Sequence, residues 1–186
     1  MIPPFLEAND IYLRPLLPED ADGPYLNWFN DDVVCQGNSH HVVPYTYQAA
    51  QAYIDKAQTF DSQLVLAVVL QEGHKHIGNV ALLRIDFISR SSEFAIVIGE
   101  KDCWGKGYSK QAARLIFDHA FFTINLKRIY CGTFETNITM KKLAEFMGMR
   151  EEGRRRNAAF KNNGYVDIIE FGVLRDEYIF QPPKPA

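Results

Sequence analysis

The sequence has few cysteines, and they do not form an even set. Cys35, Cys103 and Cys131 are odd in number and far apart in the chain. Small secreted proteins usually carry even sets of cysteines that form a disulfide framework, whereas free thiols are typical of a reducing compartment. The sequence therefore predicts a cytoplasmic protein with free cysteines.

The sequence also lacks a long apolar run and an excess of positive charge. No stretch approaches the roughly 18 apolar residues of a membrane helix, and the opening residues MIPPFLEAND do not resemble a signal peptide. The net charge of −3 gives no general attraction to phosphate backbones, and Arg154 to Arg156 is the only local basic run. We therefore expect neither a membrane nor a nucleic acid as a partner.

Internal repeats and low-complexity blocks are absent apart from the proline-rich end QPPKPA. A chain of 186 residues, with 47% hydrophobic and 23% charged residues, suits one globular domain with a sizeable core. We expect a single domain over residues 1–186. Its ordered part should run from about 8 to 178 and be followed by a flexible tail at 179–186.

Strands and helices are predicted from hydrophobic period and from turn residues. Strands are expected at 11–16, 64–73, 76–86, 91–100, 128–134, 148–156 and 164–174, and helices at 17–29, 46–60, 107–123 and 137–147. The second and third strands should form a hairpin, because only a short Gln-Glu-Gly-His turn joins their apolar runs. The predicted fold class is α/β (α+β) with a mixed sheet.

The stretch GEKDCWGKGYSKQAARLIF, residues 99–117, joins a predicted strand to a predicted helix through a glycine-containing turn. Five residues separate Gly99 from Gly105, which excludes a P-loop, and Lys110 stands where a dinucleotide fingerprint needs its third glycine. Free amides at a helix start form an anion site, most naturally for a pyrophosphate. From local sequence alone, a plain tight turn explains Gly105 and Gly107 equally well.

Four longer segments together resemble one known family. They are LRPL, EFAIVIGEKDCWGKGYSKQAARLIFDHAFFTINLKRIYC, TNITMKKLAEFMGMREEGRRR and NGYVDIIEFGVL. They resemble the GNAT superfamily of acetyl-CoA-dependent N-acetyltransferases, most closely the branch of the RimJ/RimL-like and amino-sugar acetyltransferases. The resemblance extends from Leu13 to Leu174 and implies a mixed, mostly antiparallel central sheet flanked by helices, with acetyl-CoA as co-substrate.

The resemblance also implies which residues hold the cofactor. The family's pyrophosphate loop falls on Trp104, Gly105, Lys106, Gly107, Tyr108 and Ser109, whose backbone amides would wrap the phosphates. Asp102 stands where the family has Gln or Arg, so we expect its side chain to turn outward or the loop to be shifted. The preceding strand would place Ile96, Val97 and Ile98 along the pantetheine arm.

Asn137 opens the helix expected at 137–147. The resemblance implies that Asn137 hydrogen-bonds the pantetheine or holds the strand ends apart, while a plain N-cap is an equally good interpretation of the residue itself. Family members often carry a Ser or a Tyr further along this helix to protonate the departing thiolate, but Met140 and Ala144 occupy those positions. Water, Tyr130, Cys131 or Tyr165 are the remaining sources of that proton.

A carboxylate is the expected catalytic group, because an ammonium must lose a proton before it can attack a thioester. Glu93 is the first candidate, since it begins the pantetheine strand in a sequence typical of this branch. A surface position is the competing interpretation of Glu93. Asp31, Asp32 and Asp86 are weaker candidates for the same role.

The acceptor pocket is expected from residues 28–47 and 154–165, the first of which mixes His, Asn, Ser, Tyr and Trp. His40 and His41 are adjacent and would face opposite sides of a strand, so no metal site is expected. Arg154 and Arg156 could meet an acidic acceptor or form a solvated strand face.

Three functions remain open from the sequence. The first is acetyl transfer to the primary amine of a small molecule such as an amino sugar, by direct attack in a ternary complex. The second has a protein amino terminus as acceptor, as in the ribosomal-protein acetyltransferases. The third is a CoA-binding module without catalysis, which Asp102, Met140 and Ala144 suggest. A homodimer is compatible with each of the three.

Overall fold

The protein folds around one sheet of eight strands, in the order β1-β2-β3-β4-β5-β6-β8-β7. The structure, a computed structural model, describes residues 3–59 and 61–179, so the predicted tail lies almost wholly outside the described residues. The strands are β1 (Leu6–Glu7), β2 (Ile11–Pro15), β3 (Leu64–Leu70), β4 (His76–Asp86), β5 (Ser91–Ile98), β6 (Arg128–Phe134), β7 (Arg150–Lys161) and β8 (Gly164–Leu174).

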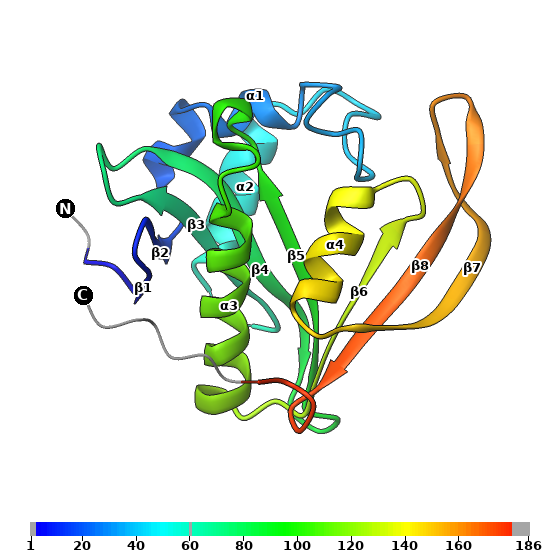
Figure 1. The fold of residues 1–186 in the computed structure, drawn as a ribbon. Coiled ribbons are helices and arrows are strands. Elements are labelled where there is room, and N and C mark those ends of the chain that lie inside the picture. The colour runs from blue at the N-terminus through cyan, green and yellow to red at the C-terminus, as the bar shows by residue number, and fades with distance from the viewer. Residues whose placement is uncertain (1–2, 60, 180–186) are drawn as a thin grey trace.

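The sheet is mixed and mostly antiparallel, as predicted. Every neighbouring pair of strands is antiparallel except β5 and β6, which are parallel. A parallel pair needs a crossover connection, and α3 (Tyr108–Asp118) followed by a π-helical turn (His119–Thr123) supplies it. Figure 1 shows α3 lying across the sheet, and β7 and β8 extending away from it as a long hairpin.

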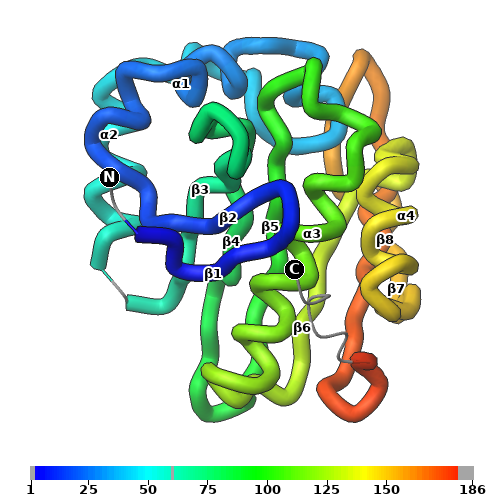
Figure 2. The backbone as a smooth tube through the Cα atoms, turned by 60° about the vertical axis from the view of Figure 1, so that its left-hand side comes forward, coloured from blue at the N-terminus to red at the C-terminus, as the bar shows by residue number. Residues whose placement is uncertain are grey.

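Helices cover both faces of the sheet and create two separate cores. One core packs residues of α3 and α4 (Ile138–Phe146) against one face, and the other packs α1 (Tyr25–Trp28) and α2 (Tyr47–Ala57) against the opposite face. Successive side chains of β5 point to opposite faces of the sheet and contribute to both cores. Phe94 and Ile96 pack in the first core, and Ala95 and Val97 pack in the second. Figure 2 shows α1 and α2 on the left of the sheet and α4 on the right.

The prediction of one continuous helix at 17–29 is wrong. Residues Pro18–Asp22 form a 3₁₀ helix, and the chain then turns before the short helix α1. Pro24 is the physical reason, because proline has no N–H to continue a helix and pushes the preceding residue toward extended conformations. Gly23 has that extended conformation, with φ −93° and ψ −163°.

Other boundaries differ in length rather than in type. β7 continues to Lys161, five residues beyond the predicted end at Arg156, because it pairs with β8 up to the tight turn at 162–163. The short strand β1 was not predicted. Within the residues that the structure describes, no helix has both the length and the apolar character needed to cross a membrane.

Candidate active site

β5 and β6 separate after a short stretch of pairing. Their parallel ladder joins only Ser91 to Arg128, Ser92 to Ile129 and Glu93 to Tyr130, although β5 continues to Ile98. Figure 1 shows the two strands diverging from that end of the ladder. The backbone groups of β5 that follow Glu93 therefore face β6 without a strand partner and can bind an extended ligand. Ile96, Val97 and Ile98, expected along a pantetheine arm, lie on this unpaired stretch.

The glycine loop meets the end of β5. Gly105 and Gly107 have φ values of +74° and +84°, in the left-handed region that glycine adopts without strain. Gly107 is the N-cap of α3 and provides no side-chain cap for the first amides of that helix. A Cβ added at either glycine would meet no atom within 4 Å. The loop therefore leaves open space at the positive end of a helix dipole, which suits a phosphate group.

The remaining loop residues predicted to bind the cofactor lie between β5 and the first turn of α3. Trp104 donates from Nε1 to the carbonyl of Ile98 at 2.8 Å, which fixes the loop to the end of β5. Tyr108 and Ser109 occupy the first turn of α3, and Lys106 is exposed between the two glycines. Loop, helix start and unpaired strand edge thus form one continuous surface.

Asp102 forms an ion pair with a lysine from a different turn. Its carboxylate is exposed and lies 3.2 Å from Nζ of Lys75, which is also 2.6 Å from a carboxylate oxygen of Glu100. The hydrogen bond and charge of Lys75 lower the pKa of Asp102. The negative charge of Asp102 is therefore compensated by Lys75 of the turn between β3 and β4, and its orientation relative to a bound phosphate stays a prediction.

Glu93 lies at the point where β5 and β6 separate. Residues 93, 95 and 97 share one face of β5, and Ala95 and Val97 line a cavity on that face. The carboxylate of Glu93 is about one quarter exposed (26%) and pairs with Nη1 of Arg84 at 2.8 Å. Because the Arg84 side chain is 76% exposed, water screens much of this attraction.

The weaker carboxylate candidates have other partners. Asp31 binds Nζ of Lys101 at 2.5 Å, and Asp86 accepts hydrogen bonds from the backbone of Ile88 and Ser89 in the turn after β4. Asp32 is exposed. Neither these three residues nor Glu93 is among the described residues that line the cavity beside β5, but Glu93 lies two residues before Ala95 of its wall.

That cavity measures about 330 Å³ and lies between the sheet, helices α1 and α2, and the segment that joins them. Its lining residues are Tyr25, Phe29, Asn38, His40, Tyr45, Tyr53, Val65, Asn79, Ala81, Leu83, Ala95, Ile96 and Val97. The acceptor pocket was predicted from residues 28–47 and 154–165. Four lining residues come from the first segment, whereas none comes from the second, which lies on the β7–β8 hairpin. Asn79 and the alanines were missed, because alternation along a strand gives a core position and a pocket wall the same signal. Tyr53 was missed because it lies on helix α2, outside the segments expected to form the pocket.

The segment after α1 crosses the diverging strands and is held at its far side. Asn137 donates from Nδ2 to the carbonyl of Gly37 at 3.0 Å, and Lys161 of β7 donates to the carbonyl of His40 at 3.4 Å. Figure 1 shows this segment running from α1 toward α4. Asn137 also caps α4, because its Oδ1 accepts from the amide of Met140. A contact of Asn137 with pantetheine stays a prediction.

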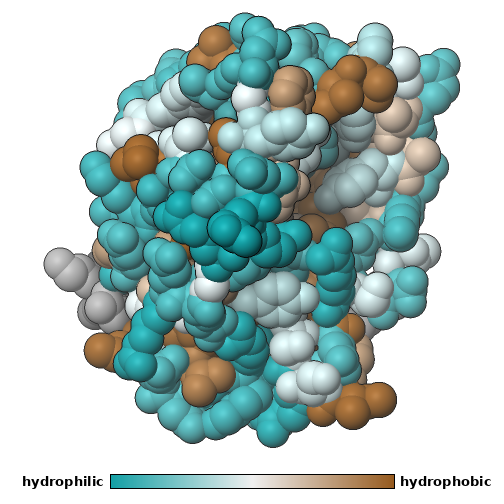
Figure 3. Space-filling view, turned by 90° about the vertical axis from the view of Figure 1, so that its right-hand side faces the viewer, coloured by the Kyte–Doolittle hydropathy of each residue, from teal (hydrophilic) through white to brown (hydrophobic). Residues whose placement is uncertain are grey.

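A second view shows the surface on the side of β7 and β8. The surface is hollowed there, with hydrophobic residues in the depth of the hollow (Figure 3). Separated strands leave such a hollow because their side chains no longer pack against each other.

The residues considered for protonating a thiolate occupy different surroundings. Cys131 is buried, and burial raises the pKa of its thiol to about 12. Tyr165 is exposed on the β7–β8 hairpin, where its ring packs against Phe160. Tyr130 pairs with Glu93 at the end of the parallel ladder. Of these three, Tyr130 is the one at the point where the strands diverge.

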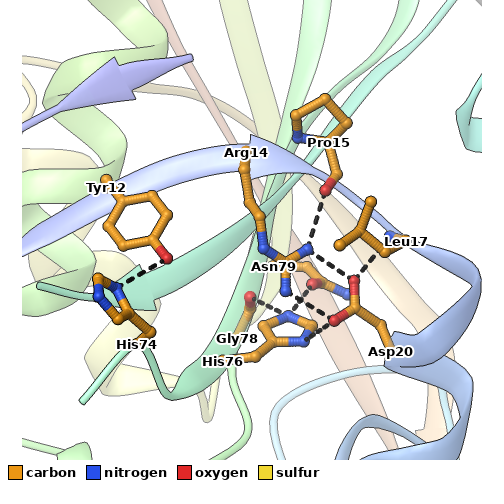
Figure 4. Close-up of polar contacts among 9 residues, drawn as sticks. All are labelled: Tyr12, Arg14, Pro15, Leu17, Asp20, His74, His76, Gly78 and Asn79. Atoms are coloured by element: carbon orange, nitrogen blue, oxygen red, sulfur yellow. Dashed lines mark hydrogen bonds and ion pairs between the residues drawn. The ribbon is translucent and has the colours of Figure 1, made fainter. Parts of the chain in front are cut away.

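One wall of the cavity rests on a buried polar network, drawn in Figure 4. Asp20 accepts two hydrogen bonds from Arg14, each 2.8 Å long, and one of its oxygens lies 3.2 Å from Nδ1 of His76. Arg14 and His76 hold the pKa of Asp20 well below its usual range, in spite of burial. Nε2 of His76 is 2.9 Å from both the carbonyl of Gly78 and Oδ1 of Asn79.

Comparison with known proteins decides the family. Residues 10–150 match the family described as "Acetyltransferase (GNAT) domain". The chain belongs to the GNAT acetyltransferase family. It is an acetyl-CoA-dependent N-acetyltransferase, as predicted, and the unpaired edge of β5 with the glycine loop is the part of the molecule that suits acetyl-CoA. The GNAT fold predicted from the sequence is likewise confirmed.

Individual relatives give a more detailed picture. The chain is 26% identical over 185 residues to spermidine N(1)-acetyltransferase of Escherichia coli K12, covering 96% of this chain and 94% of the relative. A similar solved structure is spermidine N-acetyltransferase from Vibrio cholerae in complex with CoA and spermine, with a TM-score of 0.81, 26% identity, and coverage of 91% of this chain and 98% of that chain. A shorter match, 27% identical over 101 residues, is to the putative ribosomal N-acetyltransferase YdaF of Bacillus subtilis and covers 54% of this chain and 55% of the relative.

Proposed function

We propose that this enzyme transfers the acetyl group of acetyl-CoA directly to the primary amine of a small molecule, with both substrates bound together. The observation that carries the proposal is the position of the cavity. Ala95, Ile96 and Val97 of the cavity wall belong to the same stretch of β5 that lacks a strand partner on its β6 side. An amine in the cavity and a thioester along β5 would therefore meet across one strand.

In this proposal, backbone groups bind the cofactor. The loop from Trp104 to Gly107 and the first amides of α3 would bind the pyrophosphate, and Ile96 to Ile98 would pair with the pantetheine arm. A backbone amide of β5 would polarise the thioester carbonyl. One such preorganised donor contributes about 3 to 4 kcal/mol to transition-state stabilisation in other enzymes.

Glu93 is the proposed proton acceptor for the attacking amine. It lies on the cavity face of β5, beside Ala95, and at the end of the parallel ladder. Its screened ion pair with Arg84 leaves a carboxylate oxygen that can take the proton directly or through a water molecule. Tyr130, its neighbour across the ladder, is the proposed donor to the departing thiolate.

A covalent acyl-enzyme is not part of the proposal. Cys35, Cys103 and Cys131 are all buried, and burial raises the pKa of each thiol. A nucleophilic cysteine needs the opposite shift, toward a thiolate at neutral pH. Incubation with acetyl-CoA in the absence of an amine is therefore expected to leave the intact mass of the protein unchanged, and an increase of one acetyl group would contradict direct transfer.

The acceptor is proposed to be a small amine rather than a protein. The cavity volume of about 330 Å³ suits a small molecule, and two of the relatives named above are spermidine acetyltransferases. The amino-sugar acceptor and the RimJ/RimL-like branch stay predictions. A protein amino terminus is the second candidate acceptor, because one relative is named as a putative ribosomal N-acetyltransferase.

The test is a thiol-release assay with acetyl-CoA against small amines and ribosomal amino-terminal peptides. Release of CoA with a small amine, and at a lower rate with peptides, would support the proposal. Faster release with peptides would favour the second candidate. Calorimetric binding of acetyl-CoA without release by any amine would indicate a catalytically inactive CoA-binding module.

A further inference from the structure

The walls of the cavity beside β5 are aromatic. Tyr25, Phe29, Tyr45 and Tyr53 contribute four rings, three of which touch one another: the ring centroids of Tyr25 and Phe29 are 5.3 Å apart, and those of Phe29 and Tyr45 are 5.0 Å apart. The hydroxyls of Tyr25 and Tyr45 are already 3.3 Å from each other. These rings present faces and edges to a ligand of similar shape, since aromatic groups prefer offset or edge-to-face contacts.

No carboxylate is among the described residues that line this cavity. The carboxylates considered as catalytic groups, Asp31 and Glu93, are each paired with a cation. His40 lies at the open side against Phe29, and desolvation by its neighbours together with the charge of Lys161 lowers the pKa of its imidazole. Glu93, beyond the lining residues, is assigned to the reacting amine, so no described lining residue offers a negative charge to a second or third ammonium group.

Asn79 supplies a hydrogen-bond donor inside the cavity. A carbonyl oxygen can only accept, so the contact with Gly78 shows that Nε2 of His76 carries a hydrogen. Asn79 must then present its oxygen to His76 and its NH₂ group elsewhere. Within residues 3–59 and 61–179 that NH₂ group donates no hydrogen bond. The Asn79 residue as a whole is 7% exposed and lines the cavity, so the NH₂ group can be reached from the cavity.

The orientation of the Asn79 amide is fixed by His76, which is itself held by other contacts. His76 is held between Asp20 on one side and the carbonyl of Gly78 on the other, and its ring stacks on Tyr25 with centroids 6.3 Å apart. A buried donor held in this way favours a ligand that offers an acceptor and disfavours one that leaves it unpaired.

We propose that the acceptor is a ring-bearing monoamine whose neutral body carries an oxygen that accepts a hydrogen bond from Nδ2 of Asn79. The proposal rests on the proposed function and specifies its substrate class. Two sources share this chemistry, hydroxylated aromatic amines and amino sugars, and both can lie flat against the aromatic walls. A polyamine does not fit, because its chain has only donors and several positive charges.

The first experiment compares kcat/KM of the full-length protein for tyramine, glucosamine, phenethylamine and spermidine in the thiol-release assay. The expected result is that tyramine or glucosamine exceeds spermidine by at least about tenfold, which is the factor that one well-placed hydrogen bond supplies. Which of the two is better identifies the source. A higher kcat/KM for spermidine than for either ring-bearing amine would overturn the inference and leave the proposed function intact.

The second experiment combines Asn79 variants with a matched pair of substrates. Tyramine and phenethylamine differ by one hydroxyl, so Asn79→Ala should lower kcat/KM about tenfold for tyramine and by less than threefold for phenethylamine. If the acceptor is an amino sugar, the same Asn79→Ala variant should lower kcat/KM for glucosamine in place of tyramine. Asn79→Asp should in addition raise activity toward spermidine, because it adds the missing negative charge.

Equal losses for both substrates would show that Asn79 has a structural role only and would overturn the inference. If the variants do not fold, the comparison of the four amines with the wild-type protein still decides. Absence of CoA release with all four amines, together with absence of acetyl-CoA binding in calorimetry, would overturn the proposed function and the inference with it.

Discussion

Glu93 and Tyr130 form the last residue pair of the parallel ladder between β5 and β6. Beyond this pair the strands diverge, and the β6-facing edge of β5 is left without a strand partner. In the proposed mechanism this pair supplies a carboxylate and a phenol beside the unpaired stretch of β5, two residues before Ala95 of the cavity wall. The ladder between β5 and β6 is made by backbone groups, so the pairing of these two strands does not depend on either side chain.

Glu93→Gln should lower kcat by a factor of roughly 10² to 10⁴, the usual contribution of a general base, and should leave the affinity for acetyl-CoA unchanged. Pre-steady-state kinetics and calorimetry measure the two quantities separately. Arg84→Gln is the matched control, because it removes the ion-pair partner at 2.8 Å and keeps the carboxylate. A Gln variant with wild-type rates at every pH would refute the assignment of Glu93.

Gly107→Val should abolish detectable acetyl-CoA binding, because the side chain would enter the open space above the helix start and would strain a backbone at φ +84°. Gly73→Val is the control for strain alone, since Gly73 has φ +73° and equally open surroundings in the turn between β3 and β4. Both variants should lose about 1 to 2 kcal/mol of folding stability. If Gly73→Val weakened acetyl-CoA binding as much as Gly107→Val, the phosphate site would have to be placed elsewhere.

Asp20→Asn should destabilise the protein by about 3 to 5 kcal/mol at neutral pH, because it leaves buried Arg14 without its carboxylate. The pKa of Asp20 is lowered in the folded state, so the ion pair contributes fully above the unfolded pKa of about 3.9. That contribution is lost as the pH falls from there through the folded pKa. Urea unfolding between pH 2 and pH 7 should show a smaller loss of stability on acidification for the variant; equal losses would contradict this account.

Asn137→Asp separates the two roles of Asn137. The variant keeps an oxygen to cap α4 and loses the Nδ2 donor that holds the carbonyl of Gly37 at 3.0 Å. The expected result is a higher KM for the amine with an unchanged thermal midpoint, because the segment after α1 forms one wall of the cavity. A higher KM for acetyl-CoA instead would support the contact with pantetheine that the sequence predicted.

Some features of the fold follow from local sequence and were predicted correctly. The hairpin of β3 and β4, the helix that begins after Gly107 and the strand pair β7 and β8 each depend on residues close together in the chain. Pro24, which breaks this helix, was visible in the sequence. Pro18, Glu19 and Asp20, which are typical of a first helical turn, nevertheless suggested one continuous helix. Local sequence patterns predict that a helix or strand exists, but its first and last residues are harder to predict when two patterns compete.

The sequence by itself determined the family, the glycine loop and the strand beside it, because these depend on short motifs and on backbone conformations that few residues adopt. Only the tertiary structure decided which side chains surround the amine. Asn79 and Tyr53 come from β4 and α2, and no spacing along the chain shows that they share a cavity with Phe29. The ion pair of Asp102 likewise depends on Lys75, a residue of a separate turn. Burial and charge compensation between distant segments are properties of the packed chain, so they appear only when the segments are assembled.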